Sequence, residues 1–276
     1  MAVKLLAPAK INLVLRVLAR RLDGYHELFT VFQKVTLFDE LELSLTKTPE
    51  IKIEILGASL PTDERNLCVQ AALLYREKTG LEFGLKIRLK KIIPSGSGLG
   101  GGSSDAAAVL SYLNEKFALL TQEELFSLAK ALGADVPFFL FPGSTALGRG
   151  IGERLSPWPT HPAYYVLVVP RLSISTAWAY RNLRLTIPAE PPNYVPGQPL
   201  WHQGLVNDFE PLIFEFYPEL KGLKQKLKEL GAREALLSGT GASLFGVFER
   251  RQQAEKAMES LRGKNLNVFL ATNYIP

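Results

Sequence analysis

The stretch "PSGSGLGGGSSDAA", residues 94–107, places five glycines and four serines directly before an alanine-rich segment. Glycine has no Cβ, so its backbone N–H groups can turn toward one point and a bulky ligand can approach them closely. A helix that begins at such a loop also presents free N–H groups and the positive end of its dipole to an anion. The stretch therefore predicts a phosphate site at the N-terminus of a helix that starts near Ser103 or Ser104.

The residues around this loop do not fit other nucleotide-binding loops. A Walker A loop needs a lysine, and no lysine occurs between residues 94 and 114. The GxGxxG pattern at 96–101 is followed by Glu123 and Glu124 in the first turn of an expected helix, not by the acid at a strand end that a Rossmann site requires. The VAIK and HRD strings of protein kinases are missing from the sequence. A flexible linker is the remaining alternative, and Leu99 and the adjoining helix argue against it.

Composition restricts the class of protein. A length of 276 residues favours two domains, and 47% apolar with 21% charged residues is typical of a folded globular protein. Pro8, Lys10 and Asn12 interrupt the segment where a secretory leader would be apolar, and no apolar run reaches the roughly 18 residues of a membrane span. The single cysteine, Cys68, cannot form an internal disulfide. We therefore expect a cytoplasmic protein without a membrane partner.

The net charge of +5 and the pI near 9.2 allow either a nucleic-acid partner or a small anionic substrate. The basic residues are scattered through the sequence and are not gathered in one tail. This distribution favours a small-molecule substrate and no nucleic acid. The sequence gives no indication of oligomeric state.

Periodicity predicts the main elements of the first half. Three stretches alternate apolar and polar residues, as half-buried antiparallel strands do: 41–45, 51–56 and 85–91. A helix is expected from residue 66 to a C-terminal Gly80. A second helix is expected over 121–133, where Thr121 and Glu124 can form a capping box.

Three prolines in residues 154–162 predict a domain boundary, which gives domains 1–155 and 156–276. Beyond the boundary, the expected order of β, α, β, β, α and β elements suggests a ferredoxin-like sandwich. The proline-rich insertion at 188–199 is expected to be a surface loop or a flap that faces a partner.

Two ordered motifs carry a family resemblance. The glycine stretch resembles the central motif of the GHMP kinases, the superfamily of galactokinase, homoserine kinase, mevalonate kinase and phosphomevalonate kinase, and "LLSGTGASLFGVF", residues 236–248, resembles their C-terminal glycine motif. Four further stretches narrow the resemblance to the kinases that act on diphosphocytidyl-methylerythritol: 8–41, 63–72, 133–141 and 146–155. The resemblance spans nearly the whole chain.

The resemblance implies an α+β protein with the two-domain GHMP kinase fold, an N-terminal domain like domain 2 of ribosomal protein S5 and a C-terminal ferredoxin-like domain. It implies transfer of the γ-phosphoryl group of ATP to the 2-hydroxyl of cytidine diphosphate methylerythritol, in the non-mevalonate route to isoprenoids. ATP and Mg²⁺ are the implied cofactors. The metal ligands stay unassigned.

By this resemblance, Lys10 and Asp135 are the catalytic pair. A carboxylate oriented to the attacking hydroxyl and a cation near the transferred group suit phosphoryl transfer, which depends mainly on positioning and charge. Taken alone, Lys10 fits an exposed strand lysine, and Asp135 fits a helix or turn cap that precedes an aromatic strand.

The resemblance also assigns the ATP phosphates to the glycine loop and adenosine to Asn66, although Asn66 fits a helix N-cap equally well. The predicted loop contacts are Pro94, Ser95, Gly96, Ser97, Gly98, Leu99, Gly100, Gly101, Gly102, Ser103 and Ser104. A Cβ at Gly101 or Gly102 is expected to obstruct the phosphate nest or to force a positive φ.

The substrate side is assigned in the same way. Asn12 is expected to contact the methylerythritol hydroxyls or to orient Lys10. Gly239 and Thr240, in the loop 238–243, are expected to meet the phosphate channel, and a tight β-hairpin is the structural alternative.

An Asp-Gly turn predicts that Tyr25 and His26 stand at a loop tip. By the resemblance, Tyr25 stacks on cytosine, His26 reads the base edge and Tyr180 closes the other face, with Trp178 as a rival. The alternative is a hairpin whose two rings pack on a neighbouring strand.

Two other functions stay open. A GHMP kinase of a simple alcohol, such as homoserine or mevalonate, is disfavoured by the Asp-Gly-Tyr-His segment. An S5-like nucleic-acid-binding protein would need basic and aromatic residues on one face, whereas the glycine loop holds no basic residue.

Overall fold

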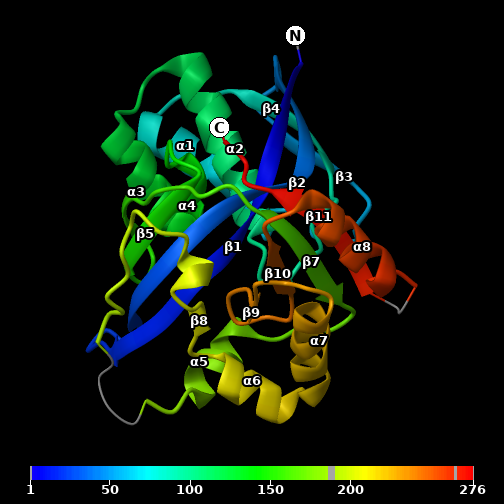
Figure 1. Cartoon of the computed structure of the whole chain (residues 1–276). Helices are drawn as coiled ribbons and strands as arrows, with labels where there is room; N and C mark the ends of the chain where they lie inside the picture. The colour runs from blue at the N-terminus through cyan, green and yellow to red at the C-terminus, as the bar shows by residue number, and fades with distance from the viewer. Residues whose placement is uncertain (1, 186–189, 264–265, 276) are drawn as a thin grey trace. The chain divides into compact units, whose positions relative to one another are not determined.

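The computed structural model describes residues 2–185, 190–263 and 266–275, which form two compact units. Unit 1 comprises the described residues of segments 1–9, 37–95 and 100–142, and unit 2 those of segments 10–36, 96–99 and 143–276. Two long strands, β1 (Val3–Arg20) and β2 (His26–Thr46), give residues to both units (Figure 1). The predicted boundary between residues 155 and 156 remains a prediction.

Unit 1 contains a short sheet. The second half of β2 pairs antiparallel with β4 (Gly84–Lys90), and β4 pairs in parallel with β3 (Ile51–Leu56). The prediction of an antiparallel arrangement is therefore wrong for β3, because helix α1 (Leu67–Thr79) lies between β3 and β4 and returns the chain in the same direction. The alternation itself is confirmed, since every second residue of β4 is buried.

The helices of unit 1 share one apolar core with these strands. They are α1, α2 (Gly101–Phe117), α3 (Gln122–Leu132) and α4 (Val136–Leu140). The left-handed C-cap at Gly80 and the capping box of Thr121 and Glu124 are both confirmed. The aromatic stretch after Asp135 is helix α4 and not a strand, because Pro137 fits the first turn of a helix and lacks the N–H that a sheet requires.

Unit 2 contains the second half of β1, the first half of β2 and the strands that pair with them. The first half of β2 pairs antiparallel with β5 (Thr145–Gly150), which pairs antiparallel with β6 (Arg154–Pro157). Strand β1 pairs in parallel with the short β8 (Val206–Asn207). This pairing places residues 206 and 207 directly beside the strand that carries Lys10.

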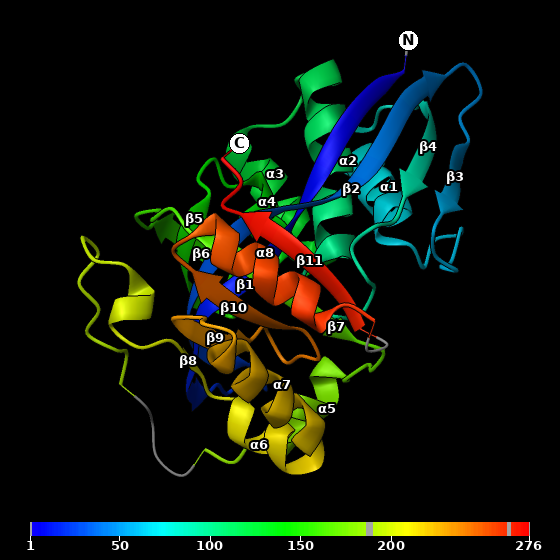
Figure 2. The same ribbon diagram turned by 45° about the vertical axis from the view of Figure 1, so that its right-hand side comes forward.

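The second sheet of unit 2 is antiparallel, with the strand order β11-β7-β10-β9. Its strands are β7 (Tyr164–Pro170), β9 (Glu234–Leu237), β10 (Leu244–Phe248) and β11 (Leu266–Thr272). Helices α7 (Pro218–Glu229) and α8 (Arg251–Leu261) cover one face (Figure 2), where Val166 and Phe248 share their core. The predicted ferredoxin-like arrangement is confirmed.

The remaining elements of unit 2 are α5 (Thr176–Asn182), the 3₁₀ turn η1 (Leu200–His202) and α6 (Glu210–Phe216). Residues 190–199 of the predicted insertion contain no helix or strand, and residues 188 and 189 lie outside the described residues. No helix in the described part of the chain is long and apolar enough to cross a membrane. The cytoplasmic location remains a prediction.

Candidate active site

A buried lysine on β1 is held by a chain of hydrogen bonds in unit 2. Lys10 and Asn12 are only 3% and 2% exposed, and they share one face of the strand because side chains alternate. Lys10 Nζ donates to Asn12 Oδ1 over 2.7 Å, Asn12 Nδ2 donates to Thr30 Oγ1 over 2.8 Å, and Thr30 Oγ1 donates to the Val14 carbonyl over 2.7 Å. The interpretation of Lys10 as an exposed strand lysine is therefore wrong. Asn12 contacts Lys10, as one of its two predicted roles requires.

The middle of the glycine loop, residues 96–99, lies in unit 2 with Lys10. The Lys10 backbone N–H donates to the Leu99 carbonyl over 2.9 Å. Gly98 has a φ of 82°, in the left-handed region, and a Cβ there would overlap the Ser238 carbonyl oxygen. Gly98 is thus required both by its backbone conformation and by the close approach of a second loop.

That second loop, residues 238–243, joins β9 to β10, so the predicted hairpin is confirmed. Ser238 Oγ donates to the Gly98 carbonyl over 3.1 Å, and Ser243 N–H donates to the Ser97 carbonyl over 3.1 Å. These bonds tie the hairpin loop to the glycine loop.

Gly239 and Thr240 follow in the same loop. An ideal Cβ on Gly239 would lie 3.7 Å from Lys10 Nζ and 3.7 Å from Asn12 Oδ1. Thr240 is buried, and its Oγ1 lies 3.1 Å from the Oγ1 of Thr176 at the start of α5. Unit 2 therefore brings the predicted residues of both glycine motifs to the buried lysine.

The rest of the glycine loop lies in unit 1, at the start of α2. This helix begins at Gly101, earlier than predicted, after an N-cap Gly100 with a φ of 72°. Ser103 is half-buried, and Ser104 is buried, with no hydrogen-bond partner for its Oγ among the described residues. Of the other predicted contacts, Pro94 is half-buried and Ser95 is exposed.

Gly101 and Gly102 have different surroundings within the first turn of α2. Neither has a left-handed φ, so the expectation of a forced positive φ is wrong for both. A Cβ on Gly101 would lie 3.0 Å from Lys91 Nζ and 3.1 Å from Asp39 Oδ2, which makes Gly101 a packing requirement. Gly102 is exposed, and a Cβ there would meet only Leu67 at 3.7 Å.

Asn66 is the N-cap of α1, as the structural alternative predicted. Its Oδ1 accepts from the Cys68 N–H over 2.9 Å, and its Nδ2 donates to the Pro61 carbonyl over 2.8 Å. The adenosine contact stays a prediction. A Cβ on Gly102 would lie 3.7 Å from Cδ1 of the adjacent Leu67, so unit 1 places the start of α1 next to the start of α2.

Three buried charges meet behind the start of α2. Lys91 is paired with Asp39 and, over 2.8 Å, with Asp105, and their side chains are at most 3% exposed. Asp39 also accepts from the N–H groups of Ile92 and Ile93 over 2.6 and 2.9 Å. Burial, opposed by Lys91 and reinforced by Asp39, raises the pKa of Asp105 from 3.8 to about 7. No sequence pattern predicted this cluster, although Asp105 belongs to the glycine motif.

Asp135 lies in unit 1, half-buried at the N-cap position of α4. Its side chain makes no capping hydrogen bond to that helix, so the interpretation of Asp135 as a helix cap is wrong, while that of a turn cap stays a prediction. The structure therefore assigns its carboxylate no capping role in α4.

The Asp-Gly turn forms as predicted, with Gly24 at a φ of 84° and the Tyr25 N–H donating to Asp23 Oδ1 over 3.1 Å. Tyr25 is 60% exposed, which contradicts the alternative of a ring packed on a strand. The His26 ring lies 5.1 Å from the Tyr180 ring, centre to centre. Burial and then Arg20 lower the pKa of His26 below its usual 6.5, which favours the neutral ring.

Trp178, the rival of Tyr180, packs elsewhere. Its ring lies 5.1 Å from that of Phe216 and 6.3 Å from that of Tyr217, both edge-on. Because His26 contacts Tyr180, the geometry supports Tyr180 as the second aromatic residue beside the Asp-Gly turn.

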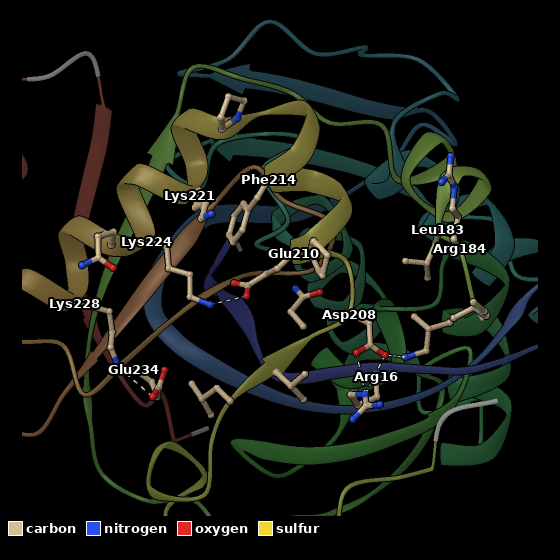
Figure 3. A pocket seen from close by; sticks show the side chains of 18 of the residues that line it. Arg16, Leu183, Arg184, Asp208, Glu210, Phe214, Lys221, Lys224, Lys228 and Glu234 are labelled. Atoms are coloured by element: carbon tan, nitrogen blue, oxygen red, sulfur yellow. Dashed lines mark hydrogen bonds and ion pairs between the residues drawn. The ribbon is translucent and has the colours of Figure 1, made fainter. Parts of the chain in front are cut away.

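A separate cavity of about 1400 Å³ lies in unit 2 (Figure 3). Its charged residues are largely paired: Arg16 with Asp208, Lys224 with Glu210, and Lys228 with Glu234. None of the predicted site residues lines it. Its two acids in the segment 206–210 were missed by sequence reasoning, because no motif marks them.

Both glycine loops lie within stretches of the chain that match family models. The chain matches the model of the GHMP kinases N terminal domain over residues 66–143 and that of the GHMP kinases C terminal domain over residues 199–267. A homoserine kinase from Cytophaga hutchinsonii, 21% identical, has a TM-score of 0.72 and covers 99% of this chain and 94% of its own, which shows the shared fold. The fold and the two motifs define a GHMP kinase.

Relatives with higher sequence identity show which family of GHMP kinases the chain belongs to. A 4-diphosphocytidyl-2-C-methyl-D-erythritol kinase of Syntrophotalea carbinolica is 42% identical over 265 residues, 94% of each chain. One of Citrifermentans bemidjiense is 43% identical over 260 residues, 92% of each chain. A crystal structure of 4-(cytidine 5'-diphospho)-2C-methyl-D-erythritol kinase has a TM-score of 0.81, 38% identity and 98% coverage of both chains. The chain belongs to the 4-diphosphocytidyl-2-C-methyl-D-erythritol kinase family.

The charge cluster of unit 1 predicts a pH dependence of stability. Because the pKa of Asp105 is higher in the folded than in the unfolded state, the folded protein binds this proton more tightly. The resulting stabilisation is present below about pH 4 and is lost as the pH rises through about 7. We expect the free energy of unfolding of the wild type, relative to Asp105→Asn, to fall between pH 5 and pH 8 in urea titrations. A difference that stays constant over this range would contradict the account.

Proposed function

We propose that this chain transfers the γ-phosphoryl group of ATP to the 2-hydroxyl of 4-diphosphocytidyl-2-C-methyl-D-erythritol. The observation that carries the proposal is the buried ammonium of Lys10, hydrogen-bonded to Asn12 and adjoined by both glycine loops of unit 2. The names of the relatives supply the substrate, since they are kinases of this compound at 38% to 43% identity.

The proposed chemistry follows from the needs of phosphoryl transfer. The substrate hydroxyl oxygen forms a bond to the γ-phosphorus while the bond to the β-phosphate oxygen breaks, and ADP leaves. Lys10 neutralises charge on the transferred group, and Asn12 fixes the direction of its ammonium. Asp135 orients the hydroxyl and accepts its proton. The glycine loop and the start of α2 hold the phosphates through backbone N–H groups.

Magnesium is expected to accompany ATP. Among the described residues, no group of three or more metal-binding side chains is present. This fits Mg²⁺, which usually keeps several waters and takes only one or two protein oxygens besides the phosphates. Ser104 Oγ is buried and has no hydrogen-bond partner in the described part of the chain, so it is the hydroxyl in the loop that would hold the ion. The ion would neutralise charge on the phosphates.

The aromatic residues support a base-containing substrate over a simple alcohol. Tyr25 is exposed at the Asp-Gly turn, next to the paired rings of His26 and Tyr180. Stacking of a base on an aromatic face contributes roughly 1 to 3 kcal/mol, and a neutral His26 can both donate to and accept from a pyrimidine edge. Homoserine and mevalonate offer no such base.

The function is tested by an ADP-release assay with ATP and each of three acceptors: 4-diphosphocytidyl-2-C-methyl-D-erythritol, homoserine and mevalonate. Turnover with the first alone, with a product heavier by one phosphoryl group in mass spectrometry, is the expected result. Turnover with homoserine or mevalonate instead would assign the chain to the simple-alcohol kinases.

Asp135→Asn is expected to lower kcat by about 10²-fold to 10⁴-fold, because the amide can hydrogen-bond the hydroxyl but cannot accept its proton. The KM for ATP and the melting temperature should stay close to those of the wild type. Steady-state kinetics with both substrates saturating provide the measurement. Turnover near the wild-type value would remove Asp135 from the reaction.

Tyr25→Ala is expected to raise the KM for the cytidine substrate about tenfold to a hundredfold and to leave the KM for ATP unchanged, because the stacking surface for one substrate is lost. Leu22→Ala is the matched control, since Leu22 is fully exposed on the same turn. Equal weakening for both substrates would indicate a folding defect. No change for either would exclude Tyr25 from the cytidine site.

A further inference from the structure

A short segment of unit 2, residues 206–210, contacts three parts of the proposed site: strand β1, the ring of Tyr180 and the loop 238–243. Its first two residues form β8, which pairs with β1 at Leu15. Phe209 packs edge-on against Tyr180, with ring centres 4.8 Å apart. The same segment reaches the loop 238–243 through Asn207. This segment therefore contacts and supports the strand of Lys10, the ring of Tyr180 through Phe209, and the hairpin loop.

Asn207 is the centre of this support. It is 3% exposed. Its Nδ2 donates to the Leu237 carbonyl over 2.8 Å and to the Gly239 carbonyl over 2.7 Å, and its Oδ1 accepts from the Phe209 N–H over 2.9 Å. Both amide hydrogens are therefore used, and they fix two carbonyls on either side of the hairpin corner.

The neighbours of Asn207 hold the segment at both ends. Asp208 pairs with Arg16 over 2.9 Å and accepts from the Val17 N–H over 2.8 Å, both on β1 (Figure 3). Glu210 accepts from the Leu237 N–H over 3.0 Å and pairs with Lys224 over 2.6 Å. Asn207 is therefore anchored between a fixed strand and the hairpin loop.

The hairpin loop 238–243 needs the hydrogen bonds of Asn207 because it places Gly239 next to Lys10. Gly239 has a φ of 60°, and it lies close enough that a Cβ would stand 3.7 Å from Lys10 Nζ. Pairing of β8 with β1 uses backbone groups, so other residues at 207 could keep the strand. Only a side chain with two N–H donors can hold the carbonyls of residues 237 and 239 together.

We propose that Asn207 is a positioning residue for phosphoryl transfer, which sets the place of Gly239 beside the Lys10 ammonium. The proposal rests on the kinase function stated above. It goes beyond that function, because it assigns a role to a residue whose side chain bonds to the hairpin loop and to Phe209 and acts on the site only through them. Small displacements of positioning groups lower turnover strongly.

The test uses Asn207→Asp in the full chain. The carboxylate keeps the shape and can still accept from the Phe209 N–H, but it offers no hydrogen to the two carbonyls. We expect kcat to fall about tenfold to a hundredfold, the KM for ATP to change less than kcat, and amide hydrogen exchange in the peptide 236–244 to accelerate. The matched control is Asn182→Asp on α5, where an exposed side chain also donates to a carbonyl, that of Trp178, over 2.8 Å.

Wild-type turnover in the same assay separates the two claims. An inactive wild type together with faster loop exchange in Asn207→Asp would overturn the kinase function and keep the anchor. An active wild type with unchanged kcat and unchanged exchange in the variant would overturn the positioning role. If Asn207→Asp does not fold, Asn207→Ser, which retains one donor, decides the question: an intermediate loss of kcat supports the proposal, and wild-type kcat overturns it.

Discussion

The candidate site depends on the burial of one positive charge, the ammonium of Lys10. A buried charge is costly unless hydrogen bonds replace the lost water. Asn12 supplies such a bond, and Thr30 and the Val14 carbonyl fix the amide with its oxygen toward the lysine. The orientation of the ammonium is therefore set before any substrate arrives, which is the condition under which an electrostatic group stabilises a transition state most.

The two glycine loops of unit 2 serve this arrangement in different ways. At Gly98 the absence of a side chain lets the Ser238 backbone approach, and at Gly239 it leaves space beside Lys10. Gly101 is different, because it makes room for the buried pair of Lys91 and Asp39 in unit 1. One motif in the sequence thus combines glycines that shape a binding surface with a glycine that is needed for packing.

The sequence predicted what depends on local pattern. Alternation identified the strands, and the Asp-Gly pair identified the turn that exposes Tyr25. The sequence did not predict features that depend on contacts between residues far apart in the chain. The parallel pairing of β3 follows from the crossover through α1. The helix after Asp135 is a different kind of error, because Pro137 is a local signal that favours the first turn of a helix over a strand. The network around Asn207 joins residues about 30 positions apart, so no local pattern could reveal it.

The central claim is that phosphoryl transfer requires the ammonium of Lys10. The most direct measurement is kcat for Lys10→Met, a substitution of similar length without charge, with 4-diphosphocytidyl-2-C-methyl-D-erythritol and ATP both saturating. The account predicts a loss of about 10²-fold to 10³-fold, the range for removal of one electrostatic group, in a protein whose circular dichroism matches the wild type. A folded Lys10→Met variant with kcat near the wild-type value would contradict it.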